Sequence, residues 1–278
     1  MTGLRISAIS FLNTAPLMWD FEHGEAARSF QVEYTLPAAC AAALAANQAD
    51  IGIIPSFAYA GIPGLVILPD IAIAAKDRVR SILLVSKKPI ERVQTVATDS
   101  SSRTSVALLQ VLFARFLGGR RRFTPHSPQL EVMLRQHDAA LLIGDAALQV
   151  PRNPGYYLYD LAHEWRARTG KPFVFAFWAV RLEALNRQPR GLDLVEVFQL
   201  SRDHGVQPEN IATLADQWSP KLGLAPADIR HYLTANVHYY LDLENQEGLQ
   251  LFLQYAQELD LIPEVPELRF LGPVGASK

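Results

Sequence analysis

The chain carries one short pattern twice: an apolar run, a polar turn and the start of a helix. The first copy is ISAISFLNTAPL at residues 6–17, and the second begins TVATDSSSRTSVALLQ at residue 95. Later in each half a second pair matches, ADIGIIPS at 49–56 and DAALLIGDA at 138–146. Apolar runs of strand length that alternate with helix starts favour α/β units on parallel sheets. We therefore predict two similar α/β lobes whose strand-end loops face a shared cleft.

The remaining apolar patterns supply the other elements. The run FVFAFWAV at residues 173–180 is apolar throughout, as expected for a strand that is buried on both faces. No linker rich in Gly or Ser separates the halves, so we expect two crossing strands, near residues 80–81 and 173. The predicted lobes are residues 1–80 with 175–278, and residues 81–174. Further strands are expected at 30–36, 64–75 and 79–86, and further helices at 37–47, 103–117, 161–169, 192–204, 208–218, 225–240 and 247–259.

Composition excludes several classes of protein. Apolar residues make up 49% of the 278 residues and charged residues 19%, which predicts a folded core. The net charge of -2 argues against a nucleic-acid partner. The single cysteine, Cys40, excludes an internal disulfide and a thiolate metal cluster. No signal peptide and no apolar run long enough to span a bilayer are visible, so we expect a cytoplasmic protein without a membrane partner.

Familiar catalytic signatures are missing, but polar residues stand at the ends of predicted strands. The chain has no Gly-rich nucleotide loop, no HExxH and no GxSxG. Only His231 and His238 fall two turns apart on one predicted helix, which we interpret as helix surface and not as a metal site. The candidate site residues are Asn13, Thr14, Ser56, Ser81, Ser101, Ser102, Arg103, Thr104, Gly144 and Asp145.

Together these residues could bind a small anion. Hydroxyls, amides and the unpaired N–H groups of a helix start all favour negative charge. Each residue alone also has a structural explanation. Ser101 and Ser102 are typical helix caps, Ser56 a turn residue, and Asp145 a cap for the next helix. Ser81 could equally satisfy a backbone group at a strand start. Only their convergence on one cleft would indicate function.

Six segments of the chain resemble a known enzyme family: ISFLNTAPL, DIGIIPS, VRSILLVS, ATDSSSRTSVALLQVL, LLIGDAAL and GKPFVFAFWAVR. They occur in the family's order over residues 6–181, and the chain there resembles the chorismate dehydratases of the futalosine route to menaquinone. The resemblance implies a two-lobed fold like type 2 periplasmic binding proteins, with a central cleft, used as an enzyme without metal or organic cofactor. It also implies conversion of chorismate to 3-[(1-carboxyvinyl)oxy]benzoate and water.

The resemblance suggests roles for the candidate residues. Asn13 and Ser81 are the expected catalytic residues, Asn13 orienting a carboxylate or the departing hydroxyl and Ser81 meeting the substrate from the cleft floor. The turn at 100–104 is expected to hold one carboxylate, with Ser56 and Asp145 lining the rim. Two bases stay open. One is Asp145, provided that it points inward and its pKa is raised, and the other is the enolpyruvyl carboxylate of chorismate itself.

Three alternatives remain at this stage. A sister enzyme that cleaves cyclic dehypoxanthinyl futalosine is expected to carry a Pro-Asn-Asp type sequence where this chain has Leu12-Asn13-Thr14. A non-catalytic binding protein for a small anion would share the fold, because a fold does not decide function. A ligand-sensing regulator would need a DNA-binding module, and the chain opens directly with a strand of the first lobe. Either a monomer or a homodimer is compatible with the sequence.

Overall fold

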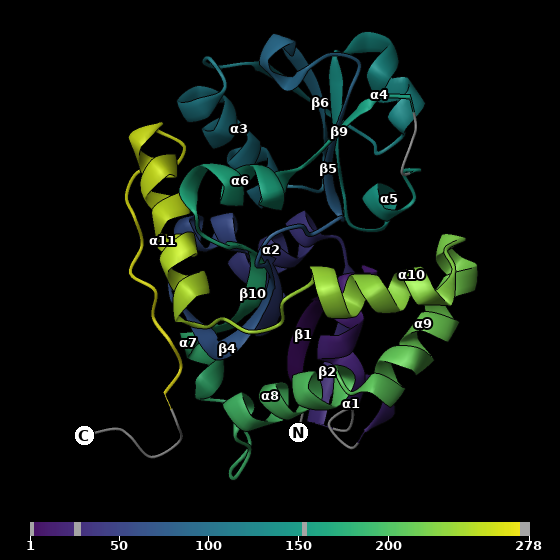
Figure 1. The fold of residues 1–278 in the computed structure, drawn as a ribbon. Helices are drawn as coiled ribbons and strands as arrows, with labels where there is room; N and C mark the ends of the chain where they lie inside the picture. Colours follow the sequence, from purple (N-terminus) through teal and green to yellow (C-terminus); the bar gives the residue numbers. More distant parts are fainter. Residues whose placement is uncertain (1–2, 25–28, 152–154, 273–278) are drawn as a thin grey trace.

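Two five-stranded sheets form the framework of the computed structural model, which describes residues 3–24, 29–151 and 155–272 (Figure 1). Their strand orders are β2-β1-β3-β10-β4 and β7-β6-β8-β5-β9. The first sheet contains β1 (Leu4–Ile9), β2 (Phe30–Thr35), β3 (Ile51–Pro55), β4 (Leu65–Ala75) and β10 (Phe173–Arg181). The second contains β5 (Ile82–Ser86), β6 (Thr95–Asp99), β7 (Arg122–His126), β8 (Ala139–Ile143) and β9 (Tyr157–Asp160).

The two sheets share one topology, which confirms the internal repeat. In the first, β1 pairs in parallel with β2 and β3, and in the second β6 pairs in parallel with β7 and β8. The predicted parallel pairing holds for these three strands of each sheet, but not for the whole sheet. A fourth strand runs antiparallel in each, β10 against β3 and β5 against β8. Each of these strands is the one by which the chain arrives from the other sheet, so the crossing reverses its direction.

The chain passes between the sheets twice, in residues 76–81 and in residues 161–172. The predicted crossing at 80–81 lies in the first passage, and the second passage ends where β10 begins at Phe173. The lobe boundary expected after residue 174 falls just inside β10. The division of the chain into lobes stays a prediction.

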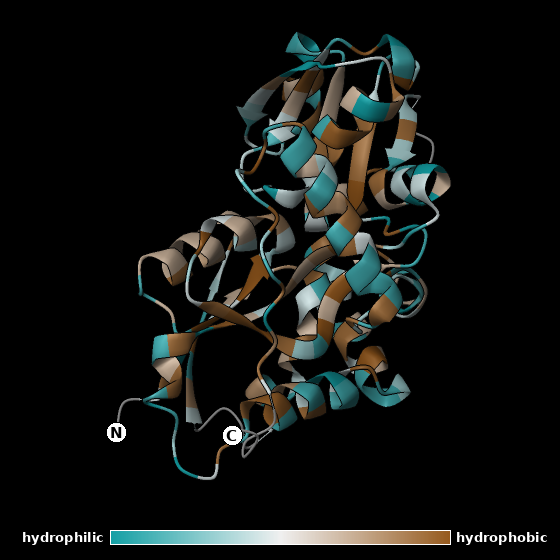
Figure 2. Ribbon diagram, turned by 90° about the vertical axis from the view of Figure 1, so that its left-hand side faces the viewer, coloured by the Kyte–Doolittle hydropathy of each residue, from teal (hydrophilic) through white to brown (hydrophobic). Residues whose placement is uncertain are grey.

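Helices cover the sheets on their outer faces. Figure 2 shows the central strands as largely apolar and the surrounding helices as mixed, and Phe173 to Val180 of β10 are all buried. α2 packs on β1 and β3, α8 on β4, and α11 on β10. The larger helices are α2 (Pro37–Ala45), α3 (Thr104–Phe116), α4 (Leu130–Gln136), α6 (Leu161–Thr169), α8 (Leu194–Gly205), α9 (Pro208–Leu222) and α11 (Leu243–Glu258). Shorter ones are α1 (Trp19–His23), α5 (Gly144–Leu148), α7 (Leu182–Leu185) and α10 (Pro226–His231). None of the helices in the described part of the chain is long and apolar enough to cross a membrane.

The helix predicted over residues 225–240 ends early. α10 continues only as a π-helical turn, η5 (Tyr232–Asn236), and the chain is then extended. The backbone of His238 exchanges two hydrogen bonds with Ala74 of β4, at 2.8 and 2.9 Å, so this segment cannot also be helical. His231 and His238 therefore do not share a helix, and the premise of that interpretation was wrong.

Candidate active site

A cavity lies between the loops of the two sheets. Its walls come from the ends of β1, β3, β4 and β8 and from the starts of β5, β10 and α3. It holds about 430 Å³, including the part that opens to solvent. Its polar lining is Asn13, Ser102, Arg103, Thr104, Ser105 and the backbone of Gly144. Its apolar lining is Ile9, Phe11, Pro37, Pro55, Ile73, Ile82, Ile143, Phe175 and Ala176.

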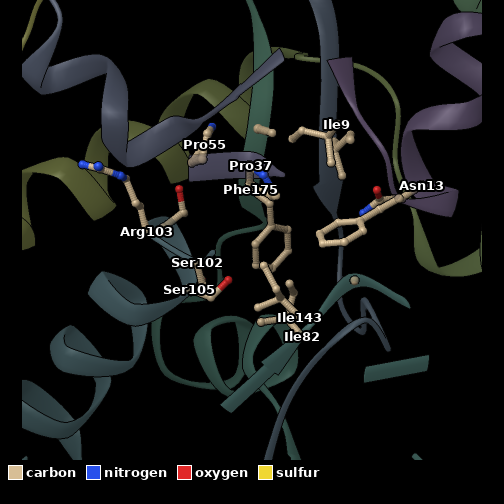
Figure 3. Close-up of a pocket in the computed structure, with 15 residues that line it drawn as sticks. Ile9, Asn13, Pro37, Pro55, Ile82, Ser102, Arg103, Ser105, Ile143 and Phe175 are labelled. Atoms are coloured by element: carbon tan, nitrogen blue, oxygen red, sulfur yellow. The ribbon is translucent and has the colours of Figure 1, made fainter. Parts of the chain in front are cut away.

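Polar groups enter this cavity from two opposite sides. Figure 3 shows Ser102, Arg103 and Ser105 on one side and Asn13 on the other, with the Phe175 ring between them. Apolar walls with a few convergent polar groups are the usual lining of a small-molecule site. This arrangement suits a compact ligand with an apolar body and polar groups at both ends.

The turn before α3 brings its residues to different places. Ser102, Arg103 and Thr104 line the cavity, as does Ser105, which the sequence analysis missed. Ser101 does not line it, because both its N–H and its hydroxyl donate to Oδ1 of Asp99, at 2.9 and 2.7 Å. Ser101 therefore shapes the turn.

Thr104 and Arg103 differ in how their side chains are engaged. The Thr104 hydroxyl accepts a 3.1 Å hydrogen bond from the N–H of Phe57, which belongs to η3 (Ser56–Gly61), and so ties the two halves together. Arg103 is exposed and is the one charged residue of the described lining. Its guanidinium has no partner among the residues that the structure describes. It is therefore free to bind an anion.

The opposite wall comes from the 3-10 helix η1 (Leu12–Met18). This helix follows β1, where the sequence predicts a helix start. Asn13 is 8% exposed and Thr14 only 1%. Neither Oδ1 of Asn13 nor Oγ1 of Thr14 has a hydrogen-bond partner in the described structure. Asn13 lines the cavity, whereas Thr14 lies outside the described lining.

The two predicted serines at other strand ends are both fully buried, and neither belongs to the described lining. The Ser56 hydroxyl donates a 2.7 Å hydrogen bond to the carbonyl of Val174 and so ties η3 to β10. The Ser81 hydroxyl has no partner in the described structure, and its carbonyl accepts from the N–H of Gly144 at 2.8 Å. Ser81 therefore lies behind the cavity wall.

Gly144 and Asp145 begin α5 where the two halves touch. Gly144 has φ of +56°, and a Cβ added there would lie 2.5 Å from the Phe11 ring, so only glycine fits. The N–H of Leu12 donates to Oδ1 of Asp145 at 3.0 Å. Burial raises the pKa of Asp145 to about 6, despite that hydrogen bond. The pKa is thus raised as a base requires, but the carboxylate engages the backbone of η1 and is not part of the described lining.

Sequence reasoning also missed a buried tyrosine in the C-terminal part of the chain. Tyr232 is 3% exposed, and its hydroxyl has no partner in the described chain. Burial raises the pKa of its phenol, which the neighbouring side chains of Ser81 and Asn13 offset only in part. No local signal marks Tyr232, because its neighbours come from the other end of the chain.

Among the described residues, no group of three or more His, Cys, Asp or Glu side chains could hold a metal ion.

Known relatives place the chain in a family. A family model described as menaquinone biosynthesis matches residues 4–258. This chain belongs to that family. It is 31% identical to the chorismate dehydratase of Thermus thermophilus over 88% of its own length and 92% of that protein. The chorismate dehydratase of Campylobacter jejuni is 28% identical, over 69% of each chain. The resemblance predicted from the sequence is confirmed.

Solved structures of distant relatives bear on the fold alone. The periplasmic aliphatic sulphonate binding protein of Escherichia coli matches all of this chain and 94% of its own, with a TM-score of 0.67 at 15% identity. A Candida albicans protein with the generic periplasmic binding protein fold matches 99% of each chain, with a TM-score of 0.59 at 12% identity. The predicted two-lobed α/β fold is confirmed.

Proposed function

We propose that this chain is a chorismate dehydratase, a carbon–oxygen lyase that converts chorismate to 3-[(1-carboxyvinyl)oxy]benzoate and water in menaquinone biosynthesis. The observation that carries the proposal is the 31% identity to a protein of that name along nearly the whole of both chains. In this proposal chorismate is the small-molecule partner. The enzyme acts in the cytoplasm, as a monomer or a homodimer, and needs no metal or organic cofactor.

The cavity supports this substrate by its distribution of polarity. Chorismate has a carboxylate on its ring and a second on its enolpyruvyl arm. Arg103 with the hydroxyls of Ser102 and Ser105 offers a charged, hydrogen-bonding site for one of them. The amide of Asn13 faces the other end, and the Phe175 ring lies between the two (Figure 3). The ring of the substrate would then lie against apolar walls.

The reaction is an elimination that aromatises the ring. A proton leaves the ring carbon that bears the enolpyruvyl ether, the adjacent hydroxyl departs, and proton and hydroxide together make the water released. No carboxylate, imidazole or amine belongs to the described lining. Because Asp145 is engaged with the N–H of Leu12, we favour the enolpyruvyl carboxylate of the substrate as the base. The protein then contributes orientation of that carboxylate and fixed donors near the departing hydroxyl.

Asn13 and Ser81 differ in how they could serve the reaction. Of these two residues, Asn13 is the one that lines the cavity, so its amide can donate to a carboxylate or to the leaving hydroxyl. Ser81 is fully buried outside the described lining, so it would act as a positioning residue, through its carbonyl that accepts from the N–H of Gly144 in the cavity wall. Thr14, Ser56 and Ser101 would support the site through its framework.

The test is incubation of purified protein with chorismate and excess chelator, followed by mass spectrometry and ultraviolet absorption. Loss of one water with the spectrum of an aromatic ring supports the proposal. Chorismate that is retained but unchanged would indicate a binding protein. Chorismate that is ignored would contradict the substrate, and cyclic dehypoxanthinyl futalosine would be tried next.

A further inference from the structure

The helix that carries Asn13 is held at its start by the other half of the molecule. η1 (Leu12–Met18) follows β1 of the first sheet, and the residue before it, Phe11, supplies no side-chain cap. The first N–H groups of a helix have no partner within the helix, so side chains from elsewhere often accept from them. For the N–H of Leu12 that acceptor is Oδ1 of Asp145, at 3.0 Å, and Asp145 lies on α5, which follows β8 of the second sheet.

A second contact lies directly beside this hydrogen bond. Gly144 comes before Asp145, and Phe11 comes before Leu12. The Phe11 ring lies so close to Gly144 that a Cβ there would be 2.5 Å from it. Two consecutive residues of α5 therefore contact two consecutive residues of the first half. Asn13 is the next residue along the chain, so its place in the cavity wall depends on this contact between the halves.

The far end of η1 is anchored within its own half. The hydroxyl of Ser201 on α8 donates to the carbonyl of Leu17 at 2.9 Å. Gly205 of the same helix lies against the carbonyl oxygen of Pro16 and leaves no room there for a Cβ. The two ends of η1 are thus held by different parts of the chain, and α5 holds the end that carries Asn13.

The surroundings of Asp145 fit this holding role. Among the described residues, no basic side chain forms an ion pair with its carboxylate, and Oδ1 accepts from Leu12. Burial raises the pKa of this carboxyl to about 6, so an acid is kept here at a cost. The contact needs an oxygen that accepts a hydrogen bond, which an amide supplies as well as a carboxylate does. An asparagine should therefore serve in this place, and an alanine should not.

We propose that Asp145, with Gly144 beside it, is a positioning residue: it holds the start of η1 from the other half and so fixes where the Asn13 amide lies. The proposal rests on the proposed function, because it explains how Asn13 is placed for that reaction. Without the hydrogen bond, the start of η1 is free to move in the cavity wall. A displacement of about 1 Å can cost roughly a hundredfold in rate, so the effect should fall on turnover more than on substrate binding.

The experiment compares two variants at Asp145 with one at the far end of η1. Asp145→Ala removes the acceptor, Asp145→Asn keeps one, and Ser201→Ala removes the hydroxyl that holds the helix at Leu17. Each variant is measured for kcat and KM with chorismate and for hydrogen exchange of the Leu12 amide, which reports local opening. The side-chain amide NMR signals of Asn13, assigned by their loss in Asn13→Ala, report its placement.

Asp145→Ala should lower kcat about tenfold or more, with KM changed by no more than about threefold. Its Leu12 amide should exchange faster and the Asn13 signals should shift, because the start of η1 is no longer held. Asp145→Asn and Ser201→Ala should keep kcat within about threefold and leave the exchange and the signals close to those of wild type. Gly144→Ala, which forces a Cβ against the Phe11 ring, should resemble Asp145→Ala.

Equal kcat values for Asp145→Ala and Asp145→Asn would overturn the positioning role. So would a loss of kcat in Ser201→Ala as large as in Asp145→Ala, or Leu12 exchange and Asn13 signals that Asp145→Ala leaves unchanged. A wild-type protein that leaves chorismate unchanged would instead contradict the proposed function. In that case the exchange and NMR measurements, which need no turnover, still decide whether Asp145 holds Asn13 in place.

Discussion

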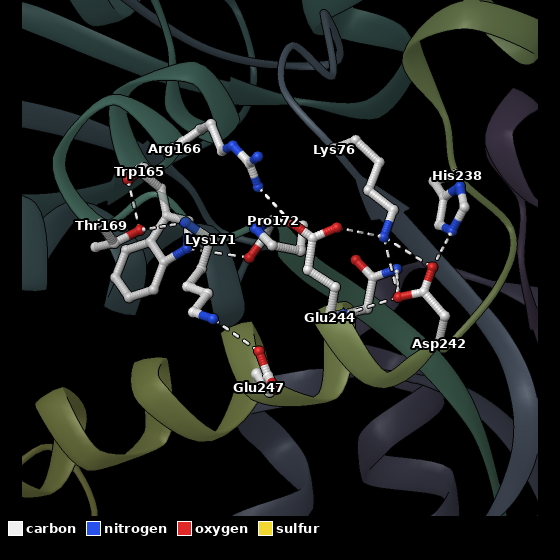
Figure 4. A network of polar contacts seen from close by, with 11 residues as sticks. Lys76, Trp165, Arg166, Thr169, Lys171, Pro172, His238, Asp242, Glu244 and Glu247 are labelled. Atoms are coloured by element: carbon white, nitrogen blue, oxygen red, sulfur yellow. Dashed lines mark hydrogen bonds and ion pairs between the residues drawn. The ribbon is translucent and has the colours of Figure 1, made fainter.

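Two polar clusters of the molecule contrast in how far their groups are satisfied. Beside the crossing between the sheets, Nζ of Lys76 lies 2.7 Å from Asp242 and 3.0 Å from Glu244, and Glu244 also binds Arg166 at 2.7 Å (Figure 4). Asp242 further accepts from His238 at 3.0 Å. Behind the cavity, the side-chain oxygens of Asn13 and Ser81 have no partner in the described structure.

The contrast separates stability from function. The ion-pair network is half-exposed, and each of its charged groups has a partner. Because Arg166 lies on α6 and Glu244 on α11, the network fastens the second crossing to the C-terminal helix. Hydrogen bonds from Arg166 and Lys76 lower the pKa of Glu244. The cavity cluster keeps unpaired groups where water does not reach, at a cost in stability. This cost in stability is the reason to propose a functional role for Asn13 and Ser81.

Arg103→Gln should give the largest effect on substrate binding. The guanidinium lines the cavity and has no partner among the described residues, so nothing in the fold depends on it. Loss of a charged hydrogen bond to a carboxylate should raise KM for chorismate roughly tenfold to a hundredfold. The thermal midpoint should stay unchanged. Arg120→Gln, at an exposed arginine outside the cavity, is the control, and an equal rise in KM there would refute an anchoring role for Arg103.

Asp145→Asn should change how stability depends on pH. The folded protein holds this proton more tightly than the unfolded chain, because burial raises the pKa from 3.8 to about 6. The contribution of this carboxyl to the free energy of unfolding is thus greatest below pH 4 and is lost as the pH rises through 6. The loss amounts to at most roughly 3 kcal/mol.

Denaturant unfolding at pH 4 and pH 8 measures that difference. The Asn variant can still accept from the N–H of Leu12, so it should gain stability over wild type at pH 8 and little at pH 4. If Asp145 were the base, turnover would fall as far as in Asn13→Ala; we expect a smaller loss. A variant that is destabilised at both pH values would contradict the pKa shift.

Lys76→Met should give the smallest effect, a loss of about 1 kcal/mol or less in the free energy of unfolding, because its partners are half-exposed and screened by salt. Turnover should not change. Lys171, which among the described residues forms an ion pair with Glu247 alone, at 2.7 Å, supplies the control variant Lys171→Met. Both variants are measured in low and in high salt. At low salt, Lys76→Met should lose more stability than Lys171→Met, and at high salt the difference between them should disappear.

The sequence predicted those parts of the site whose structure depends on short segments of the chain. The strand, turn and helix start around Asn13 and around Arg103 were predicted, and both turns reach the cavity. The antiparallel direction of β10 was not, because apolar runs carry no sign of strand direction. Tyr232 was missed for a related reason. Apolar spacing over residues 225–240 looks helical, while pairing with β4 ends the helix and sets where its tyrosine points.

The most direct test measures turnover and stability on one sample of Asn13→Ala. Since the side-chain oxygen of Asn13 has no partner in the described structure, its removal should leave the thermal midpoint unchanged or raised. Chorismate dehydration should fall about a hundredfold or more, as when a fixed donor is lost from a catalytic site. A folded variant that dehydrates chorismate at the wild-type rate, or one that loses stability while it keeps its activity, would show that Asn13 serves the fold and not the reaction.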